Sequence, residues 1–357
     1  MSYLLAFLGF VMLIVLHEAG HYTAAKAVGM RVERFSLFFG PMLWSFRRGE
    51  TEYGIAAVPL GGYVKITGMN PNEELPEAVV HRAYYNQKVW KRVVVILAGP
   101  GVNLLIAFLI VWLLFLVNGQ SVASKRVAVI QKSSPAATAL RPGDQLVSVD
   151  GVSGTPDALR NQLATHRCPG EQVNGCLAAT PAKIVVRRDG QLLTLSLTPR
   201  YSSADHRPLL GFTFGTTQQA VGPVHAASLT ATGLWGITKL TVSTMARIFE
   251  PQERKQLSGV VGGYTVTQES FAHSTTRAFE VLALISLSLA IINLFPFLPL
   301  DGGHVFWAVA EKIRGKRIPF DVMERAGVVG FVLILLVFVI GLSNDIGRLA
   351  GTGFNVR

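Results

Sequence analysis

Two histidines and a glutamate near the start of the chain form the pattern His17-Glu18-x-x-His21, inside the stretch VMLIVLHEAGHYTAAK of residues 11–26. Residues four apart on a helix share one face, so His17 and His21 can bind one metal ion from the same side. Glu18 lies one residue off that face, where it can take a proton from a water molecule at the metal without binding the metal itself. This spacing is typical of sites in which zinc activates water for hydrolysis.

A catalytic zinc ion usually has three protein ligands and one open position, so a third ligand is expected. The stretch NLFPFLPLDGGH, residues 293–304, offers Asp301. Pro296 and Pro299 interrupt an apolar segment there, and irregular backbone at membrane depth is tolerated only inside protein or beside a water-filled cavity. We therefore predict Asp301 as the third ligand. The alternative is that Asp301 caps the helix that follows it.

The elements that must position these groups are apolar. Half of the 357 residues are hydrophobic and only 15% are charged, whereas soluble proteins carry about 25% charge. A membrane-spanning helix needs ~20 mostly apolar residues. Four stretches qualify, namely residues 3–25, 93–117, 281–300 and 326–344.

Ionisable groups are costly inside a membrane, so the histidines and glutamate of the first span are expected to be functional. The alternative is a helix end at the membrane interface, where water solvates them. A cleaved signal peptide is a further interpretation of this span. No Lys or Arg precedes its apolar run and no small-residue cleavage site follows promptly, so we expect a retained helix.

The distribution of Lys and Arg predicts the orientation. Residues 26–92 carry ten of them and residues 304–325 carry five, and short basic loops face the cytoplasm. The N-terminus, residues 118–278 and the C-terminus should then lie outside, which brings Asp301 and the histidines to one depth on the cytoplasmic side. Residues 223–248 contain Lys239 and many Thr and Ser, so we expect an amphipathic surface helix and not a fifth span. The net charge of +11 does not indicate nucleic-acid binding, because the chain has no basic helix with interleaved aromatic residues.

Four stretches carry a resemblance to the site-2 protease family of intramembrane zinc metalloproteases, and within it to the bacterial regulator-of-sigma-E protease branch. They are HEAGH, VPLGGYVKITGM (58–69), ILAGPGVN (96–103) and LSLAIINLFPFLPLDGGHVF (287–306). The resemblance implies one zinc ion bound by His17, His21 and Asp301, with Glu18 as the catalytic base.

The resemblance also implies that Asn293 binds near the scissile peptide. The alternative for Asn293 is a hydrogen bond between helices of the bundle. Gly99, Pro100 and Asn103 match the family's Gly-Pro-x-x-Asn. We expect a structural role for these three residues, as a kink and a close helix contact.

The stretch TEYGIAAVPLGGYVKITGM, residues 51–69, predicts a β-hairpin or sheet edge on the cytoplasmic side. A sheet edge can take an unwound substrate as an added strand, so Gly61, Gly62 and Tyr63 are predicted substrate-binding residues. In the family that the chain resembles, such a β-structure dips into the membrane beside the active site. The alternative is a hairpin that only closes the fold. Residues 77–91 are expected to form a membrane-surface helix.

The long insert after the second span resembles a single PDZ domain. SSPAATALRPGDQLVSVDGVSG (133–154) predicts a short helix followed by a strand between turns, and KIVVRRDGQLLTLSLTP (183–199) predicts a hairpin with Asp-Gly at its turn. PDZ domains bind peptides by strand addition, so this one is expected to filter substrates or to bind a cleaved C-terminus. The alternative is a tether without a ligand. Cys168 and Cys176, the only cysteines, lie in this outer insert and are expected to form a disulfide.

The predicted fold class is a polytopic α-helical membrane protein with four transmembrane helices, a cytoplasmic-side membrane-associated β-sheet and one extracytoplasmic PDZ domain (α+β). The expected order is helix one (1–27), β-structure with an amphipathic helix (28–90), helix two (91–118), PDZ domain (119–202), linker with an amphipathic helix (203–277), helix three (278–303), cytoplasmic segment (304–325), helix four (326–345) and tail (346–357).

The predicted function is intramembrane zinc endopeptidase activity at the plasma (inner) membrane. The partners expected are the lipid bilayer and single-span membrane proteins. The resemblance implies anti-sigma factors and remnant signal peptides as substrates, and with them sigma-factor regulation and stress response. The alternative function is a non-proteolytic, PDZ-bearing membrane scaffold or chaperone with a structural zinc site. Glu18 argues against that alternative, because a structural site needs no base.

Overall fold

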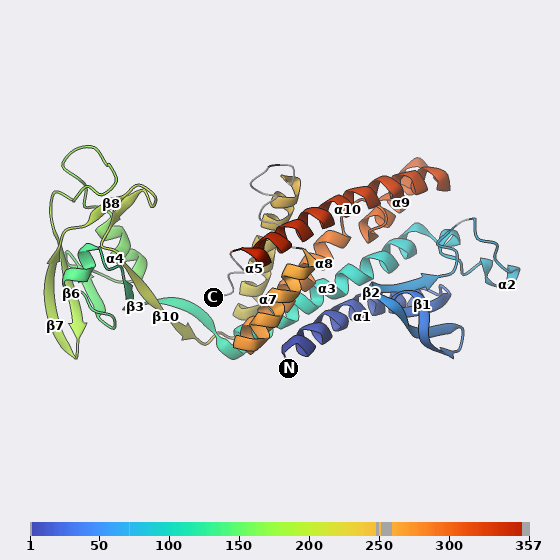
Figure 1. Ribbon diagram of the computed structural model, residues 1–357, viewed down its shortest axis with the longest axis horizontal. Helices are drawn as coiled ribbons and strands as arrows, with labels where there is room; N and C mark the ends of the chain where they lie inside the picture. The colour runs from blue at the N-terminus through green and yellow to red at the C-terminus, as the bar shows by residue number, and fades with distance from the viewer. Residues whose placement is uncertain (1, 71, 248–249, 251–258, 352–357) are drawn as a thin grey trace. The chain divides into compact units, whose positions relative to one another are not determined.

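The computed structural model describes residues 2–70, 72–247, 250 and 259–351 (Figure 1). The chain divides into two compact units. One comprises Met1–Leu114 with Pro223–Arg357, and the other comprises Phe115–Gly222. Each unit has its own buried apolar clusters, so each is held together from within.

Four helices among the described residues are long and apolar enough to cross a membrane, as predicted. They are α1 (Ser2–Ala27), α3 (Val89–Asn118), α8 (Thr275–Asn293) and α10 (Phe320–Ala350). α10 extends beyond the predicted range of 326–345 at both ends, so the predicted tail begins inside this helix. Residues 352–357 of that tail lie outside the described residues. Residues 223–248 contain the helix α5 (Pro223–Ala246), which is not one of the four.

The third apolar segment is broken where its prolines predict. α8 ends at Asn293, irregular backbone follows, and α9 begins at Asp301 and ends at Arg314. A further helix, α7 (Val260–His273), was not predicted; it lies in the stretch expected to be a linker and packs against α1 and α8.

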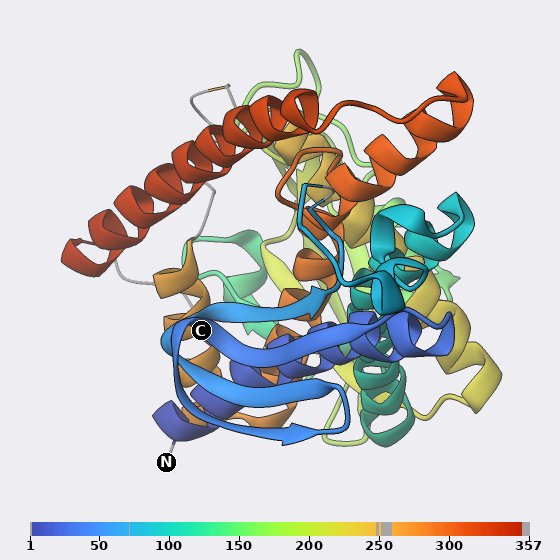
Figure 2. The same ribbon diagram turned by 90° about the vertical axis from the view of Figure 1, so that its right-hand side faces the viewer.

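A β-sheet lies beside the C-terminal half of α1 (Figures 1 and 2). It consists of β1 (Val32–Arg48) and β2 (Thr51–Ile66), and both strands are bent. Residues 34–37 of β1 therefore pair with residues 62–65 of β2 on one side and with residues 52–55 on the other. Residues 44–48 pair with residues 51–55, so four short segments lie side by side where the sequence predicted a simple hairpin.

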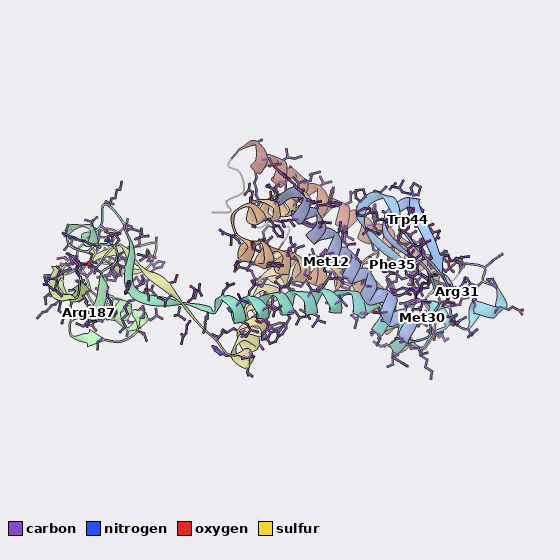
Figure 3. The ribbon with its side chains drawn as sticks, turned by 90° about the horizontal axis from the view of Figure 1, so that it is seen from below. Met12, Met30, Arg31, Phe35, Trp44 and Arg187 are labelled. Carbon is purple, nitrogen blue, oxygen red and sulfur yellow. A yellow bond between two sulfur atoms is a disulfide. The ribbon has the colours of Figure 1, made fainter. Side chains whose placement is uncertain are left out.

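The sheet is anchored through its first and last residues. Val32 and Ile66 are buried with Met30 against residues of α1 and α3. In Figure 3, Phe35 and Trp44 lie on the sheet and Met30 lies where α1 leads into it. The sheet is thereby fixed to the helices that carry the chemical groups.

The predicted surface helix over 77–91 is wrong. The structure has one helical turn, α2 (Glu77–Val80), and a 3₁₀ turn, η1 (Tyr84–Asn86), before α3 begins. The backbone nitrogens of Tyr84 and Tyr85 donate to the carbonyl oxygens of Thr67 and Gly68 at 2.8 and 3.3 Å. Because these hydrogen bonds attach the segment to the end of β2, the chain cannot continue as a helix.

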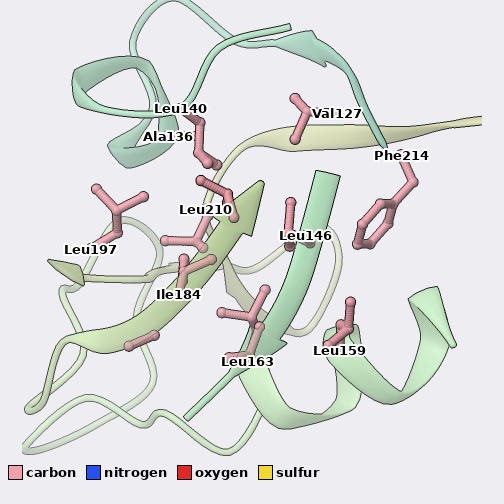
Figure 4. Close-up of a cluster of buried hydrophobic side chains, with 13 residues drawn as sticks. Val127, Ala136, Leu140, Leu146, Leu159, Leu163, Ile184, Leu197, Leu210 and Phe214 are labelled. Atoms are coloured by element: carbon pink, nitrogen blue, oxygen red, sulfur yellow. The ribbon is translucent and has the colours of Figure 1, made fainter. Parts of the chain in front are cut away.

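The second unit is built on an antiparallel sheet with strand order β10-β3-β4-β6-β7, and β5 pairs with β4. Its core is a cluster of aliphatic side chains and Phe214 between the sheet, η2 and α4 (Figure 4). The elements are β3 (Gln120–Ile130), η2 (Pro135–Thr138), β4 (Gln145–Val149), β5 (Val152–Ser153), α4 (Pro156–Leu163), β6 (Ala182–Arg188), β7 (Gln191–Leu197), β8 (Arg200–Ser202), β9 (Arg207–Leu209) and β10 (Phe212–Gln219).

The hairpin predicted over 183–199 is confirmed. β6 and β7 pair antiparallel around Asp189 and Gly190, whose φ angles of 50° and 83° are those of a two-residue turn that needs left-handed backbone. The predicted boundary at residue 202 falls too early, because β10 pairs with β3 and completes the sheet. Cys168 and Cys176 are joined in a disulfide with their Cα atoms 6.1 Å apart.

Candidate zinc centre

Three side chains from α1 and α9 converge inside the helical unit. His17, His21 and Asp301 are the one group among the described residues whose His, Cys or carboxylate ligand atoms all lie within 4.8 Å of one another. The Nε2 atoms of the two histidines are 3.2 Å apart. Oδ2 of Asp301 is 3.4 Å from Nε2 of His17 and 3.2 Å from Nε2 of His21.

These distances fit a zinc ion. Ligand atoms ~2.0–2.1 Å from a tetrahedral zinc lie about 3.3 Å from one another. Oδ2 of Asp301 is also buried without a well-formed hydrogen bond to any described residue, although both imidazoles face it. A cation among the three atoms would satisfy all of them, and two imidazoles with one carboxylate form a donor set that zinc accepts.

The close approach of α1 and α3 positions His21. A Cβ atom added at Gly20 would lie 2.6 Å from the carbonyl oxygen of Ala98, so only glycine allows this helix contact. A Cβ atom added at Gly99 would collide with the ring of His21. Nδ1 of His21 donates to the carbonyl oxygen of Val95 at 2.9 Å, which leaves the lone pair of Nε2 free for a metal.

The carboxylate of Asp301 is available to the histidines. α9 begins with Leu300 as its N-cap and has no side-chain cap hydrogen bond, so the structure does not support the alternative of Asp301 as a cap. Cβ atoms added at Gly302 and Gly303 would collide with the backbone of residues 294–298. Glycine is therefore required where this loop folds back against the first turn of α9.

A partly buried ion pair ties the rest of α9 to α3. Nη1 of Arg92 lies 2.9 Å from Oε2 of Glu311, and Arg92 is buried. Removing one partner of such a pair leaves an uncompensated charge, so the pair holds α9 against α3. Asp301 and His21 are thus both positioned by contacts with α3.

The sheet reaches the helix that carries the predicted base. A Cβ atom added at Gly62 would lie 2.9 Å from Cγ of Glu18, so β2 passes directly over the Glu18 side chain. Gly61 has a φ of 145°, and a Cβ atom there would lie 2.7 Å from Phe39. Tyr63 stacks on Phe39 and accepts a hydrogen bond from Arg34, so its side chain lies on the sheet face away from Glu18.

Two asparagines also lie at the cluster. Nδ2 of Asn293, at the end of α8, is 3.5 Å from Nε2 of His17. Nδ2 of Asn103, in α3, is 3.1 Å from Nδ1 of His17. We expected Asn103 to be structural only; the signal that could have found it is a polar side chain in an otherwise apolar run.

Helices of membrane-spanning length that carry His-Glu-x-x-His beside a partly buried aspartate define a membrane-embedded zinc peptidase. Residues 5–337 match the model of peptidase family M50, and the chain belongs to this family. The predicted membership of the site-2 protease family is thereby confirmed.

Relatives of nearly the same length agree with this assignment. The chain is 34% identical over 347 residues to the zinc metalloprotease Rip1 of Mycobacterium tuberculosis, covering 84% of this chain and 83% of that protein. It is 30% identical over 363 residues to a Brucella suis protein named "Putative zinc metalloprotease", covering 94% and 93% of the two chains. The protein is therefore a zinc metalloendopeptidase, and the predicted scaffold alternative has no support.

Proposed function

We propose that His17, His21 and Asp301 hold the zinc ion, that Glu18 is the general base, and that the enzyme cleaves peptide bonds in or near the transmembrane segments of single-span proteins. The observation that carries this proposal is the convergence of three ligand atoms from α1 and α9 within 4.8 Å. A zinc ion bound there would supply Lewis acidity to a water molecule and to the substrate carbonyl.

Glu18 is assigned the proton transfers. Glu18 lies on α1 with both histidines, but it is one residue off the helix face that they share. Its carboxylate interacts electrostatically with His17, His21 and Asp301. Its carboxylate takes the proton from the attacking water and delivers it to the leaving amine. We assign to Asn293 a hydrogen bond to the substrate backbone, and its Nδ2 atom, 3.5 Å from Nε2 of His17, supports this assignment.

We assign the sheet a role in binding the substrate. The carbonyls of a helical substrate are occupied, so the segment to be cut must be held extended. Residues 62–65 of β2 pair on one side with β1, and among the described residues no strand pairs with their other edge. Because Gly62 packs on Glu18, a substrate strand added there would lie beside the base.

The second unit is proposed as a PDZ domain outside the plasma membrane, with both chain termini on that side and the zinc centre toward the cytoplasm. Within the part of the chain that the structure describes, its terminal strand β10 has a neighbour on one side only. Arg160 of α4 lies over the ring of Phe214 of β10, 5.0 Å from its centre. A peptide could add to β10 alongside α4, which would let this unit filter substrates or bind a cleaved C-terminus. The family resemblance favours anti-sigma factors and remnant signal peptides as substrates.

The test is Glu18→Gln in the full-length protein, with cleavage of a single-span model substrate in liposomes as the readout. We expect a loss of 10²–10⁴-fold in cleavage rate, the range typical of a general base. Zinc content should stay at one ion per chain, because the amide occupies the space of the carboxylate. His17→Ala should lose both zinc and activity. Cleavage at the wild-type rate by Glu18→Gln would refute the assigned base.

A further inference from the structure

We propose that Asn103 is a positioning residue that holds His17 in the tautomer able to bind zinc through Nε2. This proposal rests on the proposed function, in which His17 is a zinc ligand. Asn103 lies in α3, is fully buried, and approaches the one ring nitrogen of His17 that faces away from Asp301.

A neutral imidazole carries one proton, and its position decides which nitrogen can bind a metal. Nε2 of His17 faces Nε2 of His21 and Oδ2 of Asp301, so it is the atom that must offer a lone pair. The proton must then sit on Nδ1, and the group beside Nδ1 must accept it. Asn103 is that group.

The amide of Asn103 can serve because its two ends have nearly the same shape. With Nδ2 toward the ring, 3.1 Å from Nδ1 of His17, Oδ1 is buried and has no partner among the described residues. That orientation would make Nδ1 the acceptor and leave the proton on Nε2. Turning the amide over places Oδ1 against Nδ1–H and the NH2 group where Oδ1 was, and it frees the Nε2 lone pair for a metal ion.

The two histidines are therefore held by different means. The carbonyl oxygen of Val95 can only accept, so it fixes the tautomer of His21 by itself. Asn103 can donate or accept, so its orientation must be chosen by its surroundings. Oγ of Ser286, in α8, donates to the backbone carbonyl of Asn103 at 2.8 Å, so this hydrogen bond holds the backbone of Asn103 and does not involve its amide group.

The experiment compares three substitutions in the full-length protein in detergent. Asn103→Leu keeps the side-chain volume and removes the hydrogen-bond acceptor. Asn103→Asp supplies a carboxylate, which accepts a hydrogen bond but does not donate one. Ser286→Ala removes a neighbouring buried hydrogen bond that does not involve His17. The zinc dissociation constant is measured by competition with a chromophoric chelator, and the Co²⁺ absorption spectrum reports the ligand geometry. Thermal unfolding checks the fold of each variant.

We expect Asn103→Leu to weaken zinc binding 10–100-fold and to change the Co²⁺ spectrum, as is typical when the partner of a ligand histidine is removed. Asn103→Asp and Ser286→Ala should stay within about threefold of wild type, because each retains an acceptor beside Nδ1. If Asn103→Leu fails to fold, Asn103→Ala takes its place beside Asn103→Asp with the same expected contrast.

Wild-type zinc affinity in a folded Asn103→Leu or Asn103→Ala variant would overturn the proposal. Equal weakening by Asn103→Asp, or by Ser286→Ala, would also overturn it, because a general packing defect would then explain the loss. Failure of the proposed function gives a different result, since His17→Ala would then leave zinc affinity unchanged.

Discussion

The zinc centre and the core of the second unit are assembled by opposite means. Around the histidines, α1 and α3 meet through Gly20 and Gly99, and hydrogen bonds such as that from His21 to Val95 fix the side chains. In the second unit, buried aliphatic residues such as Ile184 fill the space behind the sheet. Lipid gives no hydrophobic reason for helices to associate, so close backbone approach and polar contacts act instead. The helical unit therefore has no room for an added methyl group where α1 meets α3. The second unit is sensitive to the opposite change, the loss of methyl groups from its core.

The largest effect is expected from Gly99→Ala. The added Cβ atom would collide with the ring of His21, which must move off its position. A displacement of ~1 Å costs about 100-fold in rate, and we expect at least that loss in cleavage together with weaker zinc binding. Gly101→Ala, on the same helix, is the matched control, because no atom of a described residue outside the local helix backbone lies within 4 Å of a Cβ atom added at Gly101. Equal activity of the two variants would contradict the proposed crowding at the centre.

Ile184→Ala tests the core of the second unit. Ile184 is fully buried in the sheet core, and truncating such a residue costs about 2–5 kcal/mol. We expect residues 115–222 to become protease-sensitive at lower temperature while zinc content stays unchanged. Leu192→Ala, at a position 61% exposed on β7, should have little effect. Loss of zinc in Ile184→Ala would mean that the two regions are energetically coupled.

The smallest effect is expected where the sheet meets the end of α1. Glu50 accepts two hydrogen bonds from Arg82 and one from Lys26, and these cations lower its pKa from 4.5 to about 2. A carboxylate with a lowered pKa adds stability above its ordinary pKa, and this contribution is lost as the pH falls from about 4.5 toward 2.

Glu50→Gln should therefore lower the free energy of unfolding by about 1 kcal/mol at pH 7 and by much less at pH 3. Thermal unfolding at the two pH values measures the difference. The same loss at both pH values would show that the ion pairs do not anchor the sheet.

Much of the zinc centre could be predicted because its signals are local. His17, Glu18 and His21 belong to one helix, and the prolines before Asp301 mark a break that the structure contains. The contact between Asn103 and His17 could not be predicted, because it depends on where α3 lies against α1. The sheet was only partly predicted, because each of its strands bends and pairs twice. The extent of the second unit was missed because β10 pairs with β3 from far along the chain.

The sequence by itself determined the four apolar helices, the His-Glu-x-x-His face and the broken third segment, since hydropathy and helical period act over a few turns. Only the tertiary structure decided that Asp301 meets both histidines, that Gly62 lies over Glu18 and that Asn103 reaches His17. These contacts join residues far apart in the chain. They depend on which helices approach so closely that only glycine fits between them, and no local sequence pattern encodes the distance between two helices.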